Sequence, residues 1–253
     1  MSEVLVEARD GILIVTLNRP EAKNAVNADV ATAIAAAMDE LDSNPELRVG
    51  VLTGAGGVFC AGMDLKAFVA GSTPMIPGRG FGGLTEAPPK KPLIAAVEGW
   101  ALAGGFELAL ACDMIVASNA AKFGVPEVKR GLFAAGGGVV VLHKRIPRAF
   151  AMEMVLTGDP ITAERAAEIG LVNRIVEPGT ALDGALELAA TISANGPLSV
   201  AKSKELMVRS ADWSIEQAWS EQEEYFDLVF NSEDAKEGAT AFAEKRAPQW
   251  KGR

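Results

Sequence analysis

The sequence predicts an α/β protein, with a mixed core over residues 1–195 and a helical region over residues 196–253. In the first region, short apolar runs rich in Val and Ile alternate with longer stretches of helical spacing, which is the pattern of strands separated by helices. From Ala181 onward the helical spacing continues and no strand pattern returns. No linker separates the two regions, so we treat them as one functional unit.

The individual elements follow from their turns and caps. Two apolar runs on either side of Asp10-Gly11 predict a hairpin, and Asn27 is a favourable N-cap for the Ala-rich segment after it. Residues 71–91 contain four Pro and predict a long loop. The strands expected are residues 4–7, 12–17, 49–53, 93–97, 114–117 and 171–176. The helices expected are residues 27–41, 64–70, 105–111, 148–156 and 162–169, with more from residue 181 onward.

Composition narrows the classes of function. The chain has 253 residues and a net charge of −9, so we expect no nucleic-acid partner. The first residues lack the basic and apolar regions of a secretory signal, and no apolar run reaches the ~20 residues of a membrane span. Cys60 and Cys112 are too few for a disulfide framework and indicate reduced thiols. We therefore expect a cytoplasmic protein with no membrane contact.

The residue types present exclude several catalytic mechanisms. The single His, His143, lies among Lys and Arg, and no G-x-S-x-G motif exists, which argues against a Ser-His-Asp triad. No H-E-x-x-H motif or Cys-His cluster is present, so we expect no metal site. A G-x-G-x-x-G pattern at residues 78–83 lacks the preceding strand and following helix of a dinucleotide site. Carboxylates and backbone groups remain as catalytic candidates.

Glu107 is the most unusual residue of the sequence, because it is the only charged side chain in the segment GWALAGGFELALAC (99–112). Burial would raise the pKa of this carboxyl, since the charged form loses its hydration. A position facing water, or an ion pair with a Lys, would also account for it. The preceding Gly104-Gly105 favours a catalytic role, because glycines at a helix start expose backbone N–H groups that suit a developing oxyanion.

Two further segments have related features. The turn from Phe59 to Asp64 contains Gly62, follows a predicted strand and opens a short helix, so it also offers N–H groups, although a plain strand-to-helix turn has the same pattern. Two such turns facing each other would hold one carbonyl oxygen. Glu127 follows Pro126, which fixes the backbone before it, and a solvated loop Glu is the alternative interpretation.

Five segments in order carry a resemblance to a known family. They are LNRPEAKNAVN (17–27), FCAGMDL (59–65), KPLIAAVEGWALAGGFELALACD (91–113), AKFGVPE (121–127) and MEMVLTGDPITAERAAEIGLVNRIV (152–176). Through them the chain resembles the enoyl-CoA hydratase/isomerase, or crotonase, superfamily, most strongly over residues 4–195.

The resemblance implies a fold, an assembly and a reaction. The fold is a crotonase-type spiral of ββα turns, with C-terminal helices that form the interface of a homo-oligomer, a trimer or a dimer of trimers. The substrate is an acyl-CoA thioester, and no cofactor takes part, because coenzyme A enters as part of the substrate. The two catalytic Glu of hydratases match Glu107 and Glu127, and the oxyanion-hole positions match the backbone N–H groups of Met63 and Gly104. The expected reaction is the reversible syn addition of water to a trans-2-enoyl-CoA.

The CoA portion is expected to bind beside the first two motifs. Its phosphates need local cations in this acidic protein, and Lys23 and Lys66 are the candidates nearest these motifs. Lys91 and Lys129 are further candidates that could equally be solvated surface. The expected substrate- and CoA-binding residues are Lys23, Ala25, Ala61, Gly62, Asp64, Leu65 and Lys66.

The sequence departs from the hydratase pattern at four places. Ala134-Ala135 stands where hydratases usually have Pro-Gly, Val139-Val140-Val141 replaces Thr-Gln-Arg, Ala103 replaces a frequent Gly, and Glu98 replaces a frequent Asn. The first change lies where the acyl group and water are expected to bind. Another crotonase-type acyl-CoA reaction, by an isomerase, dehydratase or decarboxylase, therefore stays open, as does non-catalytic acyl-CoA binding.

Overall fold

A six-stranded sheet is the centre of the computed structural model, which describes residues 2–253. Its strands lie in the order β1-β2-β3-β6-β8-β11, with β1 and β2 antiparallel and all other neighbours parallel. They are β1 (Val4–Arg9), β2 (Ile12–Leu17), β3 (Val49–Gly54), β6 (Leu93–Val97), β8 (Met114–Ser118) and β11 (Arg174–Val176). Every residue of β6 is buried, as expected for a parallel strand covered on both faces.

The predicted hairpin between β1 and β2 is confirmed. Asp10 and Gly11 both have positive φ, 52° and 77°, and Arg9 pairs with Ile12. Positive φ at both central residues matches the twist of a tight hairpin, and Gly reaches it without strain. The predicted strand over 171–176 is shorter in the structure, because only Arg174–Val176 pairs with β8.

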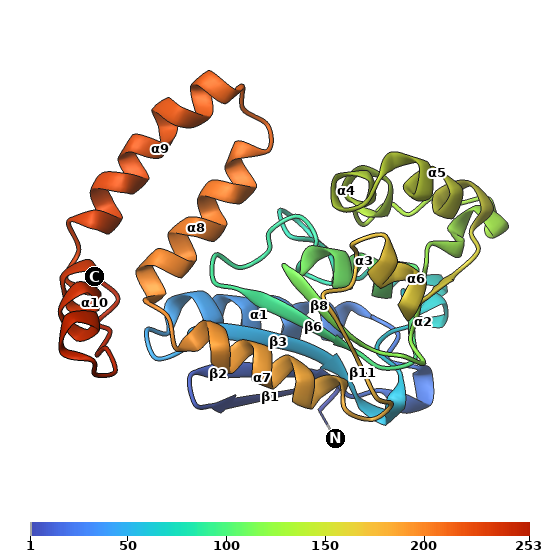
Figure 1. Ribbon diagram of the computed structural model, residues 1–253. Helices are drawn as coiled ribbons and strands as arrows, with labels where there is room; N and C mark the ends of the chain where they lie inside the picture. Colours follow the sequence, from blue (N-terminus) through green and yellow to red (C-terminus); the bar gives the residue numbers. More distant parts are fainter. Residues whose placement is uncertain (1) are drawn as a thin grey trace.

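Two helices cover opposite faces of this sheet (Figure 1). α1 (Ala28–Ser43) begins where the Asn27 side chain accepts a hydrogen bond from the backbone N–H of Val30 at 2.8 Å, as the cap predicted. α7 (Ala181–Ser193) packs on the other face through small residues spaced one turn apart, Ala181, Ala185 and Ala189.

The start of α7 explains one departure from the hydratase pattern. The side chain of Glu98 accepts hydrogen bonds from the backbone N–H groups of Gly179 at 3.0 Å and Ala181 at 2.9 Å. The side chain of Thr180, the N-cap residue of α7 itself, forms no capping hydrogen bond. Glu98 therefore caps a helix that lies far away in the sequence, and its negative charge suits the positive end of that helix.

A second, smaller sheet was not predicted from the sequence. It joins β7 (Trp100–Leu102), β9 (Lys122–Gly124) and β10 (Ile161–Thr162), with β7 and β9 parallel. Each strand has two or three residues, too few to show a period of two. α3 (Gly104–Ala111) follows β7 directly, and a short 3-10 turn at Pro126–Arg130 follows β9.

The remaining elements surround this small sheet. The long loop contains a short hairpin, β4 (Met75–Ile76) with β5 (Gly80–Phe81), which the sequence did not predict. α4 (Gly138–Arg145) was also missed, because its first turn is preceded by glycines. α2 (Leu65–Val69), α5 (Arg148–Thr157) and α6 (Ala163–Glu168) lie near their predicted positions. His143 is exposed on α4, as its charged neighbours indicated.

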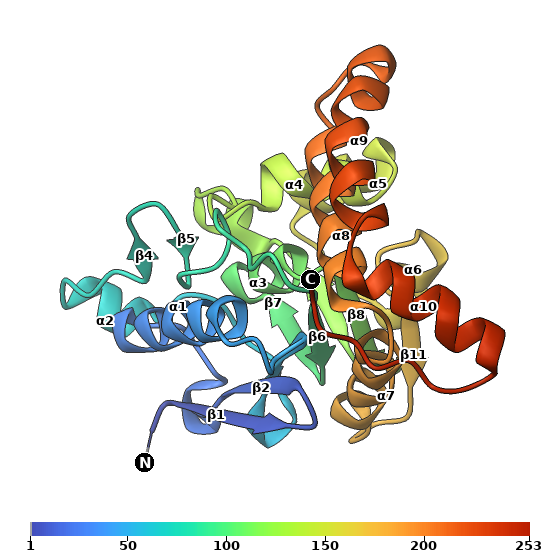
Figure 2. The same ribbon diagram turned by 90° about the vertical axis from the view of Figure 1, so that its left-hand side faces the viewer.

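Three C-terminal helices project from the body of the molecule (Figures 1 and 2). They are α8 (Pro197–Ser210), α9 (Ile215–Phe230) and α10 (Glu233–Glu244). The predicted α/β class with a helical C-terminal region is confirmed, while a folding division at residue 195 stays a prediction. Over residues 2–253, no helix combines the length and apolar character needed to cross a bilayer.

Candidate active site

Three parallel segments end together at one edge of the second sheet. Cys60 pairs with Ala101 of β7, and the Leu102 N–H donates to the Cys60 carbonyl at 3.0 Å. On the other side of β7, Leu102 pairs with Gly124 of β9. Because parallel segments place their carboxyl ends at the same edge, the residues that follow each segment converge there. Those residues are Gly62 and Met63, then Gly104 and Glu107, then Glu127.

Residues 23–26 form a fourth segment, and it orients the N–H of Met63. The Val26 N–H donates to the Gly62 carbonyl at 2.8 Å, and the Asp64 N–H donates to the Val26 carbonyl at 2.9 Å. Successive residues of an extended strand direct their N–H groups to opposite sides, so Met63 turns its own N–H away from residues 23–26. In the part of the chain that the structure describes, this N–H donates to no other group of the protein.

The two Gly-containing turns lie face to face. A Cβ placed on Gly62 would lie 3.2 Å from the Gly104 nitrogen and 2.9 Å from the Ala103 Cβ. A Cβ on Gly105 would lie 2.1 Å from the Cys60 carbonyl oxygen, which no side chain allows. Gly104 is the first residue of α3, where an N–H has no acceptor within its own helix. Two unpaired backbone donors, from Met63 and Gly104, therefore belong to adjoining turns.

Ala103 joins β7 to α3 in a conformation that favours glycine. Its φ of 52° and ψ of −130° lie where a Cβ is strained, at a typical energy of ~1–3 kcal/mol. Its own N–H donates to the Gly124 carbonyl at 2.9 Å, which fixes it to the end of β9. A Gly would adopt this conformation without strain, whereas this chain carries an Ala here. The strained turn is what presents the N–H of Gly104 at the helix start.

Glu107 lies in the first turn of α3 and is 4% exposed. Its Oε1 accepts a hydrogen bond from the backbone N–H of Gly138 at 2.8 Å, so the carboxyl faces the N-terminus of α4. The pKa of Glu107 is raised to about 7, mainly by burial and to a smaller extent by the negative charge of Glu127. The N–H groups of Gly138 and Gly136 oppose this shift, because they stabilise the ionised form.

Glu127 is half-buried, and one of its carboxyl oxygens has no protein partner. Its Oε2 is inaccessible to water and makes no hydrogen bond among the described residues. Burial raises the pKa of Glu127, and the positive charge of Arg130 opposes the rise. The influence of its charge on Glu107 indicates that the two carboxyls lie near each other. A buried unpaired oxygen is rare in proteins and is expected to bond to a ligand or a water molecule.

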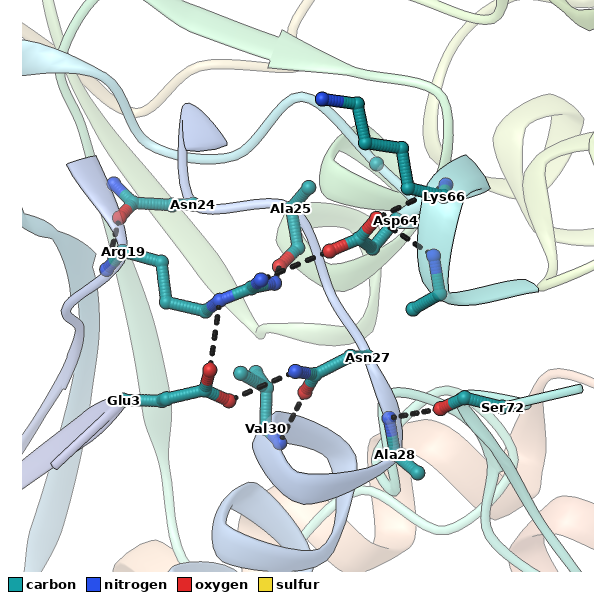
Figure 3. Close-up of polar contacts among 12 residues, drawn as sticks. Glu3, Arg19, Asn24, Ala25, Asn27, Ala28, Val30, Asp64, Lys66 and Ser72 are labelled. Carbon is teal, nitrogen blue, oxygen red and sulfur yellow. Dashed lines mark hydrogen bonds and ion pairs between the residues drawn. The ribbon is translucent and has the colours of Figure 1, made fainter. Parts of the chain in front are cut away.

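The residues expected to bind CoA divide into three groups. Lys23, Leu65 and Lys66 are exposed, and neither Lys forms an ion pair within residues 2–253, so both ammonium groups can meet phosphates. The polar groups of Ala25 and Asp64 are instead bonded to Arg19 (Figure 3). Ala61 and Gly62 act through the backbone, since the Ala61 N–H donates to the Lys23 carbonyl at 3.0 Å.

Two other Lys residues that the sequence suggested as phosphate-binding candidates have partners within the protein. The Lys91 ammonium donates to the carbonyls of Asn44 and Leu47, both at 2.7 Å. Lys129 forms an ion pair with Asp159. Both side chains therefore stabilise local structure, and Lys23 and Lys66 are the better placed candidates.

The sequence did not single out three residues that shape the site. Gly138 and Gly136 supply the N–H groups around Glu107, and their signal was the Gly-rich run beside Ala134-Ala135. Arg19 connects the turns around Met63, and its signal was its place in the first motif. Over the described range, no group of three or more His, Cys, Asp or Glu side chains is arranged to hold a metal ion.

Comparison with known proteins decides the family. A family model described as enoyl-CoA hydratase/isomerase matches residues 7–253. The chain belongs to the enoyl-CoA hydratase/isomerase family. Among its curated relatives, an enoyl-CoA hydratase of Mycobacterium tuberculosis is 44% identical, over 99% of this chain and 97% of the relative. A carnitinyl-CoA dehydratase of Salmonella arizonae is 46% identical over 100% of both chains.

Solved structures of the family agree with the fold. An enoyl-CoA hydratase from Mycobacterium tuberculosis superposes with a TM-score of 0.99 at 60% identity and covers 100% of both chains. A carnitinyl-CoA hydratase from Mycobacterium avium gives a TM-score of 0.81 at 46% identity, also over 100% of both chains. The resemblance seen in the five motifs is thereby confirmed, and the chain is a crotonase-type acyl-CoA enzyme of the enoyl-CoA hydratase/isomerase family.

Proposed function

We propose that this protein is an enoyl-CoA hydratase that adds water, reversibly and in syn fashion, to trans-2-enoyl-CoA thioesters. One observation carries the proposal. Two carboxyls with raised pKa values, the buried Glu107 and the half-buried Glu127, follow the same edge of the small sheet as two backbone N–H groups that have no acceptor within residues 2–253. Hydration needs this combination, because it moves two protons and places transient negative charge on one oxygen.

The unpaired N–H groups of Met63 and Gly104 hold the thioester carbonyl oxygen in this proposal. As water attacks the β-carbon, electrons move towards the carbonyl and negative charge grows on its oxygen. Backbone donors fixed beforehand in a dry site stabilise that charge more than the neutral substrate, and one such donor typically contributes about 3–4 kcal/mol. The tight packing of Gly62 and Gly105 keeps both donors in place.

The two carboxyls take different roles because their surroundings differ. Glu107 accepts a hydrogen bond from Gly138, which favours its ionised form, so it takes a proton from the attacking water. Glu127 has a buried oxygen without a donor, which favours its neutral form, so it delivers a proton to the α-carbon. The water oxygen ends on the β-carbon, and both carboxyls exchange roles in the reverse reaction. The pair titrates jointly, so the pH dependence belongs to both.

The rest of the substrate is assigned to the surface beside these turns. The exposed side chains of Lys23 and Lys66 bind the CoA phosphates. The residues that line or support the adjoining part of the CoA site are Ala25, Ala61, Gly62, Asp64 and Leu65. Hydration involves no net oxidation or reduction, and the donors and carboxyls described above supply the acid, base and oxyanion contacts. We therefore assign no metal or redox cofactor, with coenzyme A as part of the substrate.

The projecting helices support a homo-oligomer, a trimer or dimer of trimers. Several large apolar side chains on α8–α10 are exposed in the single chain, among them Met207 at 77%, Trp219 at 64% and Phe242 at 88%. Apolar surface of this kind is stabilised when another subunit covers it. Light scattering tests the assembly, and a monomer at micromolar concentration would contradict it. The free, buried thiols of Cys60 and Cys112 support a cytoplasmic location.

Product analysis across a panel of acyl-CoA substrates tests the reaction. We expect conversion of crotonyl-CoA and medium-chain trans-2-enoyl-CoA to 3-hydroxyacyl-CoA. A dehydratase is the second candidate, because relatives that are 43–46% identical along their whole length are named carnitinyl-CoA dehydratases, so carnitinyl-CoA belongs in the panel. Turnover of carnitinyl-CoA alone would favour that activity. Tight acyl-CoA binding without turnover of any substrate would refute the catalytic proposal.

A further inference from the structure

We propose that Arg19 is a positioning residue that aligns the Met63 N–H with the thioester oxygen, an inference that rests on the proposed function. Arg19 lies just after β2, and its side chain is 15% exposed. Figure 3 shows its guanidinium between residue Ala25 and the start of α2. It joins the two segments that flank Met63.

Each end of the guanidinium holds one of these segments. Its Nη1 donates to the Ala25 carbonyl at 2.6 Å, and its Nη2 donates to the Asp64 carboxylate at 2.9 Å. Asp64 in turn caps α2, where its Oδ1 accepts from the N–H groups of Lys66 and Ala67, both at 3.1 Å. The planar fork of Arg can bridge a carbonyl and a carboxylate at once, whereas a Lys ammonium is a point charge on a flexible stem.

Met63 lies between the residues that Arg19 fixes. Val26 follows Ala25 and is hydrogen-bonded to both neighbours of Met63, Gly62 and Asp64, as described above. Arg19 therefore closes a ring in which the backbone direction at Met63 is set from both sides. Loss of the bridge would leave the Val26 ladder intact but free Asp64 and the turn to rotate, which would tilt the Met63 N–H.

The charge of Arg19 is balanced without a substrate. Its Nε pairs with the Glu3 carboxylate at 3.0 Å, and the other oxygen of Glu3 accepts from the Asn27 side chain at 2.9 Å. Asn27 caps α1, so the network also ties the first helix to the turn. With two carboxylates and a carbonyl as partners, the guanidinium has an intramolecular role, and it is not a free cation for the CoA phosphates.

This arrangement makes a kinetic prediction that differs from that for a CoA-binding residue. A positioning residue for the oxyanion donor changes kcat, because a displaced donor stabilises the transition state less. We expect Arg19→Gln and Arg19→Lys to lower kcat for crotonyl-CoA by ~10–100-fold, with KM changed less than about threefold, since small misplacements near the reacting atoms have effects of this size. Arg165→Gln removes an exposed Arg paired with Glu168 and serves as the matched control.

The decisive measurement is the carbon-13 chemical shift of the carbonyl in bound, carbonyl-labelled butyryl-CoA. This saturated thioester cannot be hydrated, so the shift reports hydrogen bonding to the oxygen independently of turnover. In the wild-type protein and Arg165→Gln we expect the bound carbonyl to shift away from its free value. In the Arg19 variants we expect the shift to return part of the way. If both Arg19 variants fail to fold, Asp64→Asn, which keeps the capping oxygen but loses the charge, is expected to show the same partial return.

The outcomes separate the two proposals. A wild-type carbonyl shift that stays unchanged in folded Arg19→Gln and Arg19→Lys, or in Asp64→Asn where those two do not fold, would overturn the positioning role alone. A rise in KM with unchanged kcat would do the same and assign Arg19 to CoA binding. Butyryl-CoA bound by the wild-type protein without any carbonyl shift would overturn the oxyanion hole itself, and with it both proposals.

Discussion

Replacing Glu107 by Gln is expected to stabilise the protein while removing most of its activity. The substitution keeps the volume of a side chain that is 4% exposed, and a Gln oxygen can still accept the Gly138 N–H. It removes the ability to ionise and replaces one carboxyl oxygen by an amide NH2. The two effects can therefore be measured on one variant, in a pH range where the buried carboxyl titrates.

The stability effect follows from the pKa. The pKa of the Glu107 carboxyl has its ordinary value of 4.5 in the unfolded chain and is about 7 in the folded protein. Between these values the unfolded state is ionised while the folded state keeps its proton, so the free energy of unfolding falls as pH rises. Above about 7 both states are ionised and the loss is complete. At about 1.4 kcal/mol per pKa unit, the wild-type protein loses roughly 3 kcal/mol that the Gln variant keeps.

Urea unfolding at pH 4.5 and pH 8 measures this difference, with Glu153→Gln on the exposed face of α5 as the control. Initial rates of crotonyl-CoA hydration, followed by the ultraviolet absorbance of the conjugated thioester, measure the second effect. We expect kcat to fall by ~10²–10⁴-fold, the usual contribution of a general base. The gain in free energy of unfolding of the Gln variant over wild type should be larger at pH 8 than at pH 4.5. An equal gain at both pH values, or an unchanged kcat, would refute the buried-base assignment.

Three further predictions use the same assays. The profile of kcat/KM against pH should be bell-shaped around the joint titration of the Glu107–Glu127 pair, because the reaction needs one ionised and one neutral carboxyl, whereas a flat profile would contradict the pair as acid and base. Ala103→Gly should raise the free energy of unfolding by about 1 kcal/mol, because relief of ~1–3 kcal/mol of strain exceeds the greater entropy of unfolded Gly; denaturant titration checks this, and a loss of stability would argue against strain. Glu98→Ala should lower stability by about 1–2 kcal/mol by uncapping α7, with kcat unchanged and Glu98→Gln milder; equal stability of all three proteins would show that the cap contributes nothing.

The elements with long, regular patterns were predictable from the sequence. The hairpin at Asp10-Gly11, the Asn27-capped helix and the buried strand at residues 93–97 all formed as expected, because local propensity and tertiary packing agree there. The second sheet was not predictable, since strands of two or three residues carry no period and exist only because their neighbours complete them.

The site was predictable in its residue types and less so in its contacts. The apolar segment around Glu107 left open whether its carboxyl is buried, faces water or pairs with a Lys, and the structure shows that it is buried. The unpaired oxygen of Glu127 could not be foreseen, because no local pattern shows what covers a loop residue. The cap that Glu98 provides joins residues 83 positions apart, and the Arg19–Asp64 contact spans 45. Contacts of that range depend on the assembled fold and leave no periodic signal in the sequence.

The parallel strands β7 and β9, together with the Cys60 segment that pairs with β7, give the functional groups three segment ends at one edge. The donors and carboxyls follow a hydrogen-bond ladder that runs through residues 60–64, 100–103 and 122–124, while residues 71–91 connect the first two of these segments and residues 131–135 come after the third. Connecting segments of this kind tolerate insertion and exchange far better than the ladder beside them. Replacing residues 71–91 and 131–135 with their counterparts from other members of the family should therefore change acyl-chain preference, while Gly136, Gly138 and the catalytic carboxyls stay in place.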